Sequence, residues 1–258
     1  MLKEIIQNKK KEIEISKKPL PLDSFKHKLK NSNRDIQKAL SKDKLNLIAE
    51  IKRKSPSQNV TAQKNALSFG TKRFFEIIKA YNQYADAISV LTDKKFFDGS
   101  LMDMKTVGKL TKLPILRKDF IIDEYQIYES RLYGADAILL ISSVLSKDKL
   151  NNFIKIANSY KMDCLVEVNT ENELNKVLDS NVSIIGINNR NLNTLEVDTK
   201  TTLKLIDKIP KDKIIVSESG ILSSEYVKRI KNKVNAILVG TFFMNSTKLE
   251  EDMMSLIQ

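Results

Sequence analysis

Acidic and basic side chains interrupt a short apolar run near the start of this chain. Glu50 and Lys52 follow Ile48 at every second position, so the three side chains lie on one face of an extended strand. A carboxylate and an ammonium group buried in a strand are costly unless they are paired or take part in chemistry. From these residues alone, a reactive pair and a purely structural ion pair at the strand end are both open.

Two further runs carry groups suited to proton transfer. Lys118 follows Leu116 by two positions, so it points inward if Leu116 does; the alternative is a solvated loop lysine. Glu167 lies inside the apolar run Cys164–Val168, and carboxylates are seldom buried there. Burial raises the pKa of a carboxylate and suits it to general acid–base catalysis. The alternative is a salt bridge with an inward lysine, and both interpretations can hold together.

Three later runs end in groups that bind anions or hydroxyls. Asn188 and Arg190 share a strand face, although Asn is also common in turns. Gly220 and Gly240 follow the last two runs, beside Ser219 and Thr241 respectively. Glycine lets backbone N–H groups approach an anion, and parallel barrels often bind phosphate after strands seven and eight. Two tight turns are the alternative.

The histidine and the cysteine of the chain do not indicate a metal site. His27, the single histidine, lies in the N-terminal segment. Cys164 alternates with Leu165 and Glu167 along its strand, so it faces the opposite side and is predicted to pack in the core. The sequence has no His and Cys cluster with zinc spacing. Any acid–base chemistry must therefore use lysine and glutamate, without a metal.

The charge balance favours a small anionic partner. Lys and Arg number 44 against 32 Asp and Glu, a formal net charge of +12. Such a balance can attract nucleic acid or anionic substrates. The lysines are dispersed and the aromatic residues lie within apolar patterns, unlike the basic and aromatic surface of a nucleic-acid-binding protein. We expect no nucleic-acid partner.

The apolar runs also predict where the protein works. None reaches the roughly 18 residues of a membrane helix. The first residues lack an apolar core followed by a small-residue cleavage site, so no signal peptide is expected. A single cysteine forms no disulfide within the chain and fits a reducing compartment. We expect a cytoplasmic protein with no membrane partner.

Short apolar runs alternate with amphipathic stretches after residue 44. The runs that read as buried strands are Leu45–Ile51, Ala87–Leu91, Ile115–Leu116, Ala137–Ile141, Cys164–Val168, Ile184–Ile187, Ile214–Val216 and Ala236–Val239. Helical patterns between them include Phe74–Gln83, Gln126–Tyr133, Lys147–Ser159, Glu171–Leu178 and Ser223–Lys231. This order predicts an α/β fold, a (β/α)8 TIM barrel. A doubly wound sheet is the alternative, but no Gly-rich dinucleotide motif follows the first strand.

The first 44 residues have no place in the eightfold repeat. They read as a helix, a break at Pro19 and Pro21, and a second helix from about Asp23 to Leu40. We expect one domain over residues 1–258, with residues 1–44 as an N-terminal helical extension that packs on the catalytic face. The segment Asn59–Arg73 is longer than most strand–helix loops, which is typical of an active-site loop or an insertion.

Seven segments resemble signatures of the indole-3-glycerol phosphate synthase family, in their usual order. They are IAEIKRKSPS, ISVLTDKKFFDGS, PILRKDFIIDEYQI, GADAILLI, LVEV, IGINNRNL and VSESGI. The start, LKEIIQNKKKEI, resembles the family's N-terminal helix, so the resemblance covers essentially the whole chain. It implies a carboxy-lyase of tryptophan biosynthesis, an aromatic amino acid pathway. Its substrate would be 1-(2-carboxyphenylamino)-1-deoxyribulose 5-phosphate, with ring closure, decarboxylation and dehydration and no cofactor.

The resemblance also implies catalytic roles. Lys118 would be the general acid for the carbonyl or the departing oxygen, and Glu167 the matching base or proton shuttle. Lys52 would pair with the substrate carboxylate and is the alternative acid in one step. Glu50 would orient the lysines or take part in proton transfer. Asn188 would contact the region of the departing hydroxyl.

Binding roles follow from the same resemblance. Phe97 and Phe120 would form the pocket for the aromatic ring, Arg190 would support the substrate carboxylate, and Glu218 would tune the centre. The positions that match the phosphate side are Ser55, Ser219, Gly220, Gly240 and Thr241.

Another phosphate-binding barrel, such as phosphoribosylanthranilate isomerase, is the nearest alternative. That reaction commonly uses a cysteine and an aspartate at strand ends, whereas Cys164 is expected to face outward. A monomer or weak homodimer is expected, and association with other tryptophan-pathway enzymes is left open by the sequence.

Overall fold

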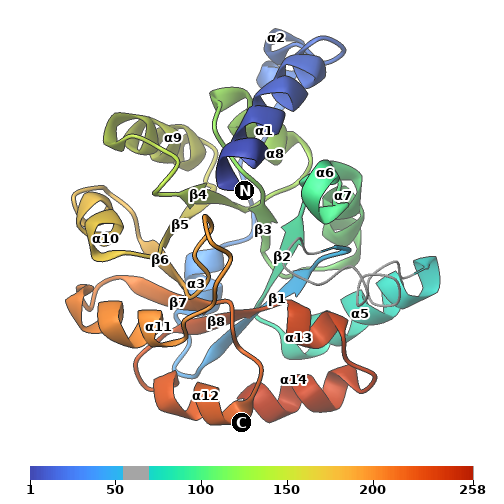
Figure 1. Cartoon of the computed structure of the whole chain (residues 1–258). Helices are drawn as coiled ribbons and strands as arrows, with labels where there is room; N and C mark the ends of the chain where they lie inside the picture. Colours follow the sequence, from blue (N-terminus) through green and yellow to red (C-terminus); the bar gives the residue numbers. More distant parts are fainter. Residues whose placement is uncertain (55–69, 258) are drawn as a thin grey trace.

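A closed barrel of parallel strands forms the centre of the protein. We analysed a computed structural model, which describes residues 1–54 and 70–257. The strands pair in chain order, from β1 with β2 around to β8 with β1, as the end-on view of Figure 1 shows. They are β1 (Asn46–Ile51), β2 (Ala87–Leu91), β3 (Ile115–Lys118), β4 (Ala137–Ile141), β5 (Asp163–Val168), β6 (Ile184–Asn188), β7 (Ile214–Glu218) and β8 (Ala236–Val239). The predicted TIM barrel is confirmed, and the doubly wound sheet is excluded.

Helices surround the barrel and cover its outer face (Figure 1). Those that follow the extension are α5 (Thr71–Tyr84), α6 (Lys94–Phe97), α7 (Leu101–Leu110), α8 (Glu124–Leu132), α9 (Lys147–Ser159), α10 (Glu171–Leu178), α11 (Lys200–Leu205), η2 (Ile206–Lys208), α12 (Ser224–Ile230), α13 (Thr241–Met244) and α14 (Leu249–Ile257). Side-chain caps start several of them: Ser146, Thr170 and Ser223 each accept a hydrogen bond from a backbone N–H of the first turn.

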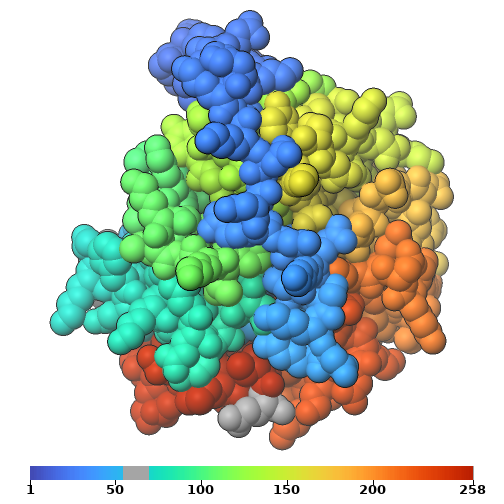
Figure 2. Space-filling model, turned by 180° about the vertical axis from the view of Figure 1, so that it is seen from behind, coloured from blue at the N-terminus to red at the C-terminus, as the bar shows by residue number. Residues whose placement is uncertain are grey.

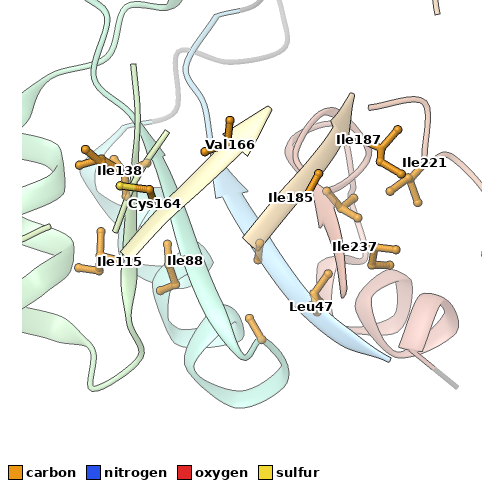
Figure 3. Packing of buried hydrophobic residues seen from close by; sticks show 14 of the residues in the cluster. Leu47, Ile88, Ile115, Ile138, Cys164, Val166, Ile185, Ile187, Ile221 and Ile237 are labelled. Carbon is orange, nitrogen blue, oxygen red and sulfur yellow. The ribbon is translucent and has the colours of Figure 1, made fainter. Parts of the chain in front are cut away.

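The alternation of side chains along the strands builds two apolar layers. Leu47 and Ala49 of β1 face the helices, in the outer layer that Figure 3 shows in close-up. Ile48 faces the barrel interior and packs with Leu116 and Leu165. At the carboxyl ends of β1, β3 and β5 the inward side chains are polar, namely Glu50, Lys118 and Glu167.

The N-terminal extension divides between the two ends of the barrel. Helix α1 (Leu2–Lys17) lies at the carboxyl ends of the strands, the open end seen in Figure 1. Helix α3 (Ile36–Leu40) lies at the other end, where Ile36 and Leu40 are fully buried against the interior layer. Figure 2, the view from behind, shows the blue segment crossing that other end of the barrel. The prediction that all of residues 1–44 pack on the catalytic face is therefore wrong for α3.

The predicted second helix is also shorter than expected. Residues from Asp23 to Leu40 form α2 (Leu22–Phe25), the 3-10 turn η1 (Lys26–Lys28) and α3, with irregular chain between η1 and α3. Arg34, within that irregular stretch, pairs with Asp136 at 2.7 Å and donates to the carbonyl oxygens of Thr111 and Gly134. These contacts hold the chain extended against the end of the barrel opposite the cavity. The helical spacing of apolar residues in the sequence does not indicate this extended stretch.

Candidate active site

A cavity of about 280 Å³ lies at the carboxyl ends of the strands, beneath α1. Every predicted site residue except Ser55 lines it: Glu50, Lys52, Phe97, Lys118, Phe120, Glu167, Asn188, Arg190, Glu218, Ser219, Gly220, Gly240 and Thr241. Ser55 lies outside the described residues. So do residues 59–69 of the segment Asn59–Arg73. The side chains come from strands spread around the barrel, so strand closure alone brings them to one mouth.

Lys118 lies at the centre of a group of carboxylates. Its Nζ is 3.3 Å from Glu167 Oε2 and 2.9 Å from Glu218 Oε2. Glu167 Oε1 accepts a further hydrogen bond of 2.8 Å from Asn188 Nδ2. The inward orientation of Lys118 and Glu167 is therefore confirmed, and the two open interpretations of Glu167 combine, since it is both buried and paired.

The carboxylates decide the charge state of Lys118. Burial by itself lowers the pKa of this ammonium group, but attraction by Glu218, Glu167 and Glu50 outweighs it and raises the pKa well above its usual value. Burial raises the pKa of Glu218 to about 7, although Lys118 acts in the opposite direction. The group thus contains a protonated amine beside a carboxyl that titrates near neutral pH, an arrangement suited to moving protons.

Glu50 and Lys52 form a second pair on the opposite side of the mouth. Lys52 Nζ lies 3.1 Å from Glu50 Oε1 and donates a 3.0 Å hydrogen bond to Thr241 Oγ1. The Glu50 side chain also explains Gly240, because a Cβ at residue 240 would lie 2.4 Å from Glu50 Oε1. The strand-end glycine after β8 thus makes room for a carboxylate of the site.

Apolar and cationic groups complete the walls. The rings of Phe97 and Phe120 lie 6.2 Å apart between centroids, tilted by 36°. Arg190 is half-buried, and its Nη1 donates to the carbonyl oxygen of Leu195 at 2.9 Å. Arg190 also lines the cavity.

The loop after β7 carries an unusual backbone. Ser219 and Gly220 both have positive φ, 65° and 72°. A Cβ at residue 220 would lie 2.7 Å from Val197 Cγ1 and 2.9 Å from Thr199 Cγ2. Only glycine suits this position, both for its φ and for the close approach of the neighbouring loop.

A family model described as indole-3-glycerol phosphate synthase matches residues 2–256. The chain belongs to the indole-3-glycerol phosphate synthase family. The indole-3-glycerol phosphate synthase of Caldanaerobacter subterraneus subsp. tengcongensis is 46% identical over 95% of this chain and 93% of its own length. That of Acetivibrio thermocellus is 42% identical over 97% of this chain and 96% of its own. The family and the enzyme class, a carboxy-lyase of tryptophan biosynthesis, are as the sequence predicted.

Solved structures of other barrels share the fold. The 3-hexulose-6-phosphate synthase of Salmonella typhimurium superimposes with a TM-score of 0.63, at 12% identity, over 83% of this chain and 97% of its own. KGPDC from Streptococcus mutans gives a TM-score of 0.61 at 14% identity, over 83% and 96%. At such low identity these likenesses concern the fold alone.

Three further features of the described residues concern the cysteine, metal binding and membrane crossing. Cys164 packs in the outer layer between strands and helices, so it faces away from the cavity, and burial raises the pKa of its thiol. No three His, Cys, Asp or Glu side chains in residues 1–54 and 70–257 gather as a metal site. In the same part of the chain no helix combines the length and apolarity needed to cross a membrane.

Sequence reasoning missed the apolar rim of the synthase cavity. Leu2 and Ile5 of α1 and Leu192, Leu195 and Val197 of the loop after β6 all line it. A signal exists for the loop residues, because apolar side chains recur within the otherwise polar stretch NRNLNTLEV. For α1 the apolar spacing predicts a buried stripe but does not say what it covers.

Proposed function

We propose that this cavity converts 1-(2-carboxyphenylamino)-1-deoxyribulose 5-phosphate into indole-3-glycerol phosphate, with Lys118 as the general acid. The observation that carries the proposal is the placement of Lys118 Nζ within 3.3 Å of both Glu167 and Glu218. An ammonium group held between two carboxylates supplies a proton and leaves acceptors nearby to take one up. The aromatic pair Phe97 and Phe120 supports a flat ring in the adjacent wall.

The reaction requires one carbon–carbon bond to form and one to break. The ring carbon that bears the carboxylate attacks the sugar carbonyl, whose oxygen takes a proton from Lys118. Carbon dioxide then leaves, and the electron pair of its bond restores the aromatic ring. The new hydroxyl departs as water with a second proton, while Glu167 takes a proton from the adjacent ring carbon. Two protons pass to oxygen and Glu167 recovers one. The substrate with its ionised carboxylate, plus one proton from solvent, thus gives product, carbon dioxide and water, and the solvent proton restores the side chains.

Lys52 and Arg190 are proposed to hold the substrate carboxylate. Both side chains carry a positive charge at the mouth, and Arg is suited to carboxylates by its two parallel donors. Lys52 already contacts Glu50 and Thr241, so it is fixed before substrate arrives. Such fixed charges bring the ring and the carbonyl into reacting position, and Lys52 is the alternative proton donor in one step.

The phosphate is proposed to bind on the side of Ser219, Gly220, Gly240 and Thr241. The positive φ angles at Ser219 and Gly220 turn the backbone sharply at the end of β7, at the position where barrels commonly bind phosphate. Asn188, which donates to Glu167, is proposed to contact the departing hydroxyl. Glu50 is proposed to orient Lys52, the partner at 3.1 Å.

The domain organisation, location and oligomeric state of the protein are also proposed. We propose that residues 1–258 act as one domain, because α1 and α3 both contact the barrel, and that the protein works in the cytoplasm as a monomer or weak homodimer. The net charge of +12 steers a substrate that carries both carboxylate and phosphate.

The test is turnover of the carboxyphenylamino sugar phosphate by the purified protein. Fluorescence follows the formation of indole-3-glycerol phosphate, and release of one carbon dioxide per product checks the stoichiometry. Lys118→Ala serves as the matched blank, because it removes the proposed acid from the same scaffold. Lack of turnover by the unmodified protein would overturn the proposal.

A further inference from the structure

Helix α1 carries a buried charge within its apolar stripe. Ile5, Lys9 and Ile13 follow one another at helical spacing, and all three are buried. Lys9 is only 4% exposed. A lysine is rarely buried unless it is paired, so the position requires partners on the surface that α1 covers.

Those partners come from two strand ends of the active site. Lys9 Nζ lies 2.8 Å from Asp93 Oδ2, after β2, and 2.9 Å from Asp119 Oδ1, after β3. It also lies 2.7 Å from Glu12 of its own helix. Burial lowers the pKa of Lys9, but the two aspartates outweigh this effect and raise it well above its usual value. Lys9 thus lies as an ammonium group between two buried carboxylates.

Each of these aspartates positions an aromatic wall of the cavity. Asp93 caps α6 by accepting a 2.8 Å hydrogen bond from the N–H of Phe96, and Phe97 is the next residue. Asp119 lies between Lys118 and Phe120 in the chain, and its Oδ1 accepts a 2.8 Å hydrogen bond from the N–H of Phe120. The same Oδ1 contacts Lys9, so one ammonium group is bound to both aromatic segments.

Asp93 and Asp119 differ in the partners that each keeps when Lys9 is removed. Asp119 keeps Arg117 Nη2 at 3.0 Å and the hydroxyl of Thr92. For Asp93 the described residues offer no other cation at ion-pair distance. Loss of Lys9 would leave the Asp93 carboxylate buried without a counter-charge, and α6 would move or the carboxylate would take up a proton.

We propose that Lys9 is a positioning residue of the synthase, which locks helix α1 to the segments that carry Phe97 and Phe120 and thereby sets the shape of the aromatic pocket. The inference rests on the proposed function for its kinetic consequence. It assigns to α1 a part in substrate binding, because Leu2 and Ile5 of the same helix line the cavity. Lys9 itself does not line it.

The kinetic test compares Lys9→Met with Lys11→Met. Methionine keeps the length and apolar stem of lysine without its charge, and Lys11 is an exposed residue of the same helix. Lys9→Met is expected to raise KM by about tenfold, with a smaller change in kcat, because binding geometry is disturbed while Lys118 keeps its partners. Lys11→Met is expected to keep the KM of the unmodified protein.

A second measurement follows the coupling without turnover. Amide hydrogen exchange in Lys9→Met is expected to rise both in α1 and in residues 93–99, whereas Lys11→Met should change neither. A lysine that served only to anchor its own helix would raise exchange in α1 alone. The exchange measurement tests the coupling of α1 to residues 93–99 without any turnover. A protein that fails to turn over the proposed substrate would contradict the proposed function and not this coupling.

Removing the charge of Asp93 as well should partly reverse the effect of Lys9→Met. Asparagine at residue 93 removes the unpaired charge and still caps α6, so adding Asp93→Asn to Lys9→Met is expected to recover part of the lost KM. Should Lys9→Met not fold, Lys9→Arg keeps the charge but alters the contact geometry, and a KM rise of about threefold is expected. An unchanged KM with unchanged exchange in residues 93–99, or a double variant no better than Lys9→Met, would overturn the proposal.

Discussion

Lys118 Nζ lies 2.9 Å from Glu218 Oε2, closer than the 3.3 Å that separates it from Glu167 Oε2. The two residues are 100 positions apart in the chain, yet the barrel brings their side chains into direct contact. Glu218 therefore accepts a hydrogen bond from the proposed acid. Through this contact Glu218 raises the pKa of Lys118, which is how it is expected to affect the reacting centre.

Replacing Lys118 by alanine is expected to lower kcat by about 10²–10⁴-fold, the usual contribution of general acid–base catalysis. The physical reason is the loss of the proton donor beside Glu167 and Glu218. Steady-state fluorescence assays of product formation measure it, and Lys79→Ala on the exposed face of α5 is the control. A near-normal kcat in Lys118→Ala would move the acid role to Lys52.

Glu167→Gln keeps the shape of the side chain but removes a proton acceptor. We expect kcat to fall by about 10²-fold or more, with little change in KM. Lys118 retains Glu218 as a partner in this variant, so the fold should persist. Circular dichroism checks the fold beside the kinetics. A large rise in KM at constant kcat would instead assign Glu167 to binding.

Lys52→Ala is expected to raise KM as well as lower kcat, unlike the two changes above. The ammonium group is proposed to pair with the substrate carboxylate, so its loss weakens binding before and during reaction. Initial rates over a range of substrate concentrations separate the two constants. If only kcat falls, Lys52 acts in proton transfer rather than in binding.

Gly220→Val is expected to raise KM on the order of tenfold, because the new side chain meets Val197 and Thr199 and shifts the loop proposed to bind phosphate. The matched control is Gly134→Val. Gly134 also has positive φ, 93°, but a Cβ there meets no heavy atom within 4 Å. Both variants should lose about 1–2 kcal/mol of stability from backbone strain. Equal KM values in the two variants would place the phosphate elsewhere.

The buried Glu218 carboxyl is expected to make the free energy of unfolding depend on pH. Burial raises its pKa from 4.5 to about 7, so the folded state binds this proton more tightly than the unfolded state. The resulting stability is fully present below 4.5 and is lost as pH rises through about 7. Relative to Glu218→Gln, the unmodified protein should therefore become less stable over this range. Urea unfolding of both proteins at a series of pH values measures the difference, and a constant difference would show that Glu218 does not titrate there.

Local sequence was enough to predict the barrel and the inward faces of β1, β3 and β5. Alternation with Ile48, Leu116 and Leu165 predicted the directions of Glu50, Lys118 and Glu167, because side chains on a strand point to opposite faces in turn. The same rule predicted that Cys164 packs outside the barrel. Such predictions need only the period of one strand, which local sequence contains.

Which of these groups touch one another depends on how the strands and helices come together in three dimensions. The pairing of Lys118 with Glu218 rather than with Glu167 alone, and of Glu50 with the space beside Gly240, depends on barrel closure and register. The division of residues 1–44 between the two ends of the barrel is a further example. Helix α3 packs at the lower end because its partners come from β1 and β2, strands that local periodicity cannot place relative to it. Lys9 is a further case: nothing local to it indicates its partners, because Asp93 and Asp119 reach it only when α1 folds across the strand ends.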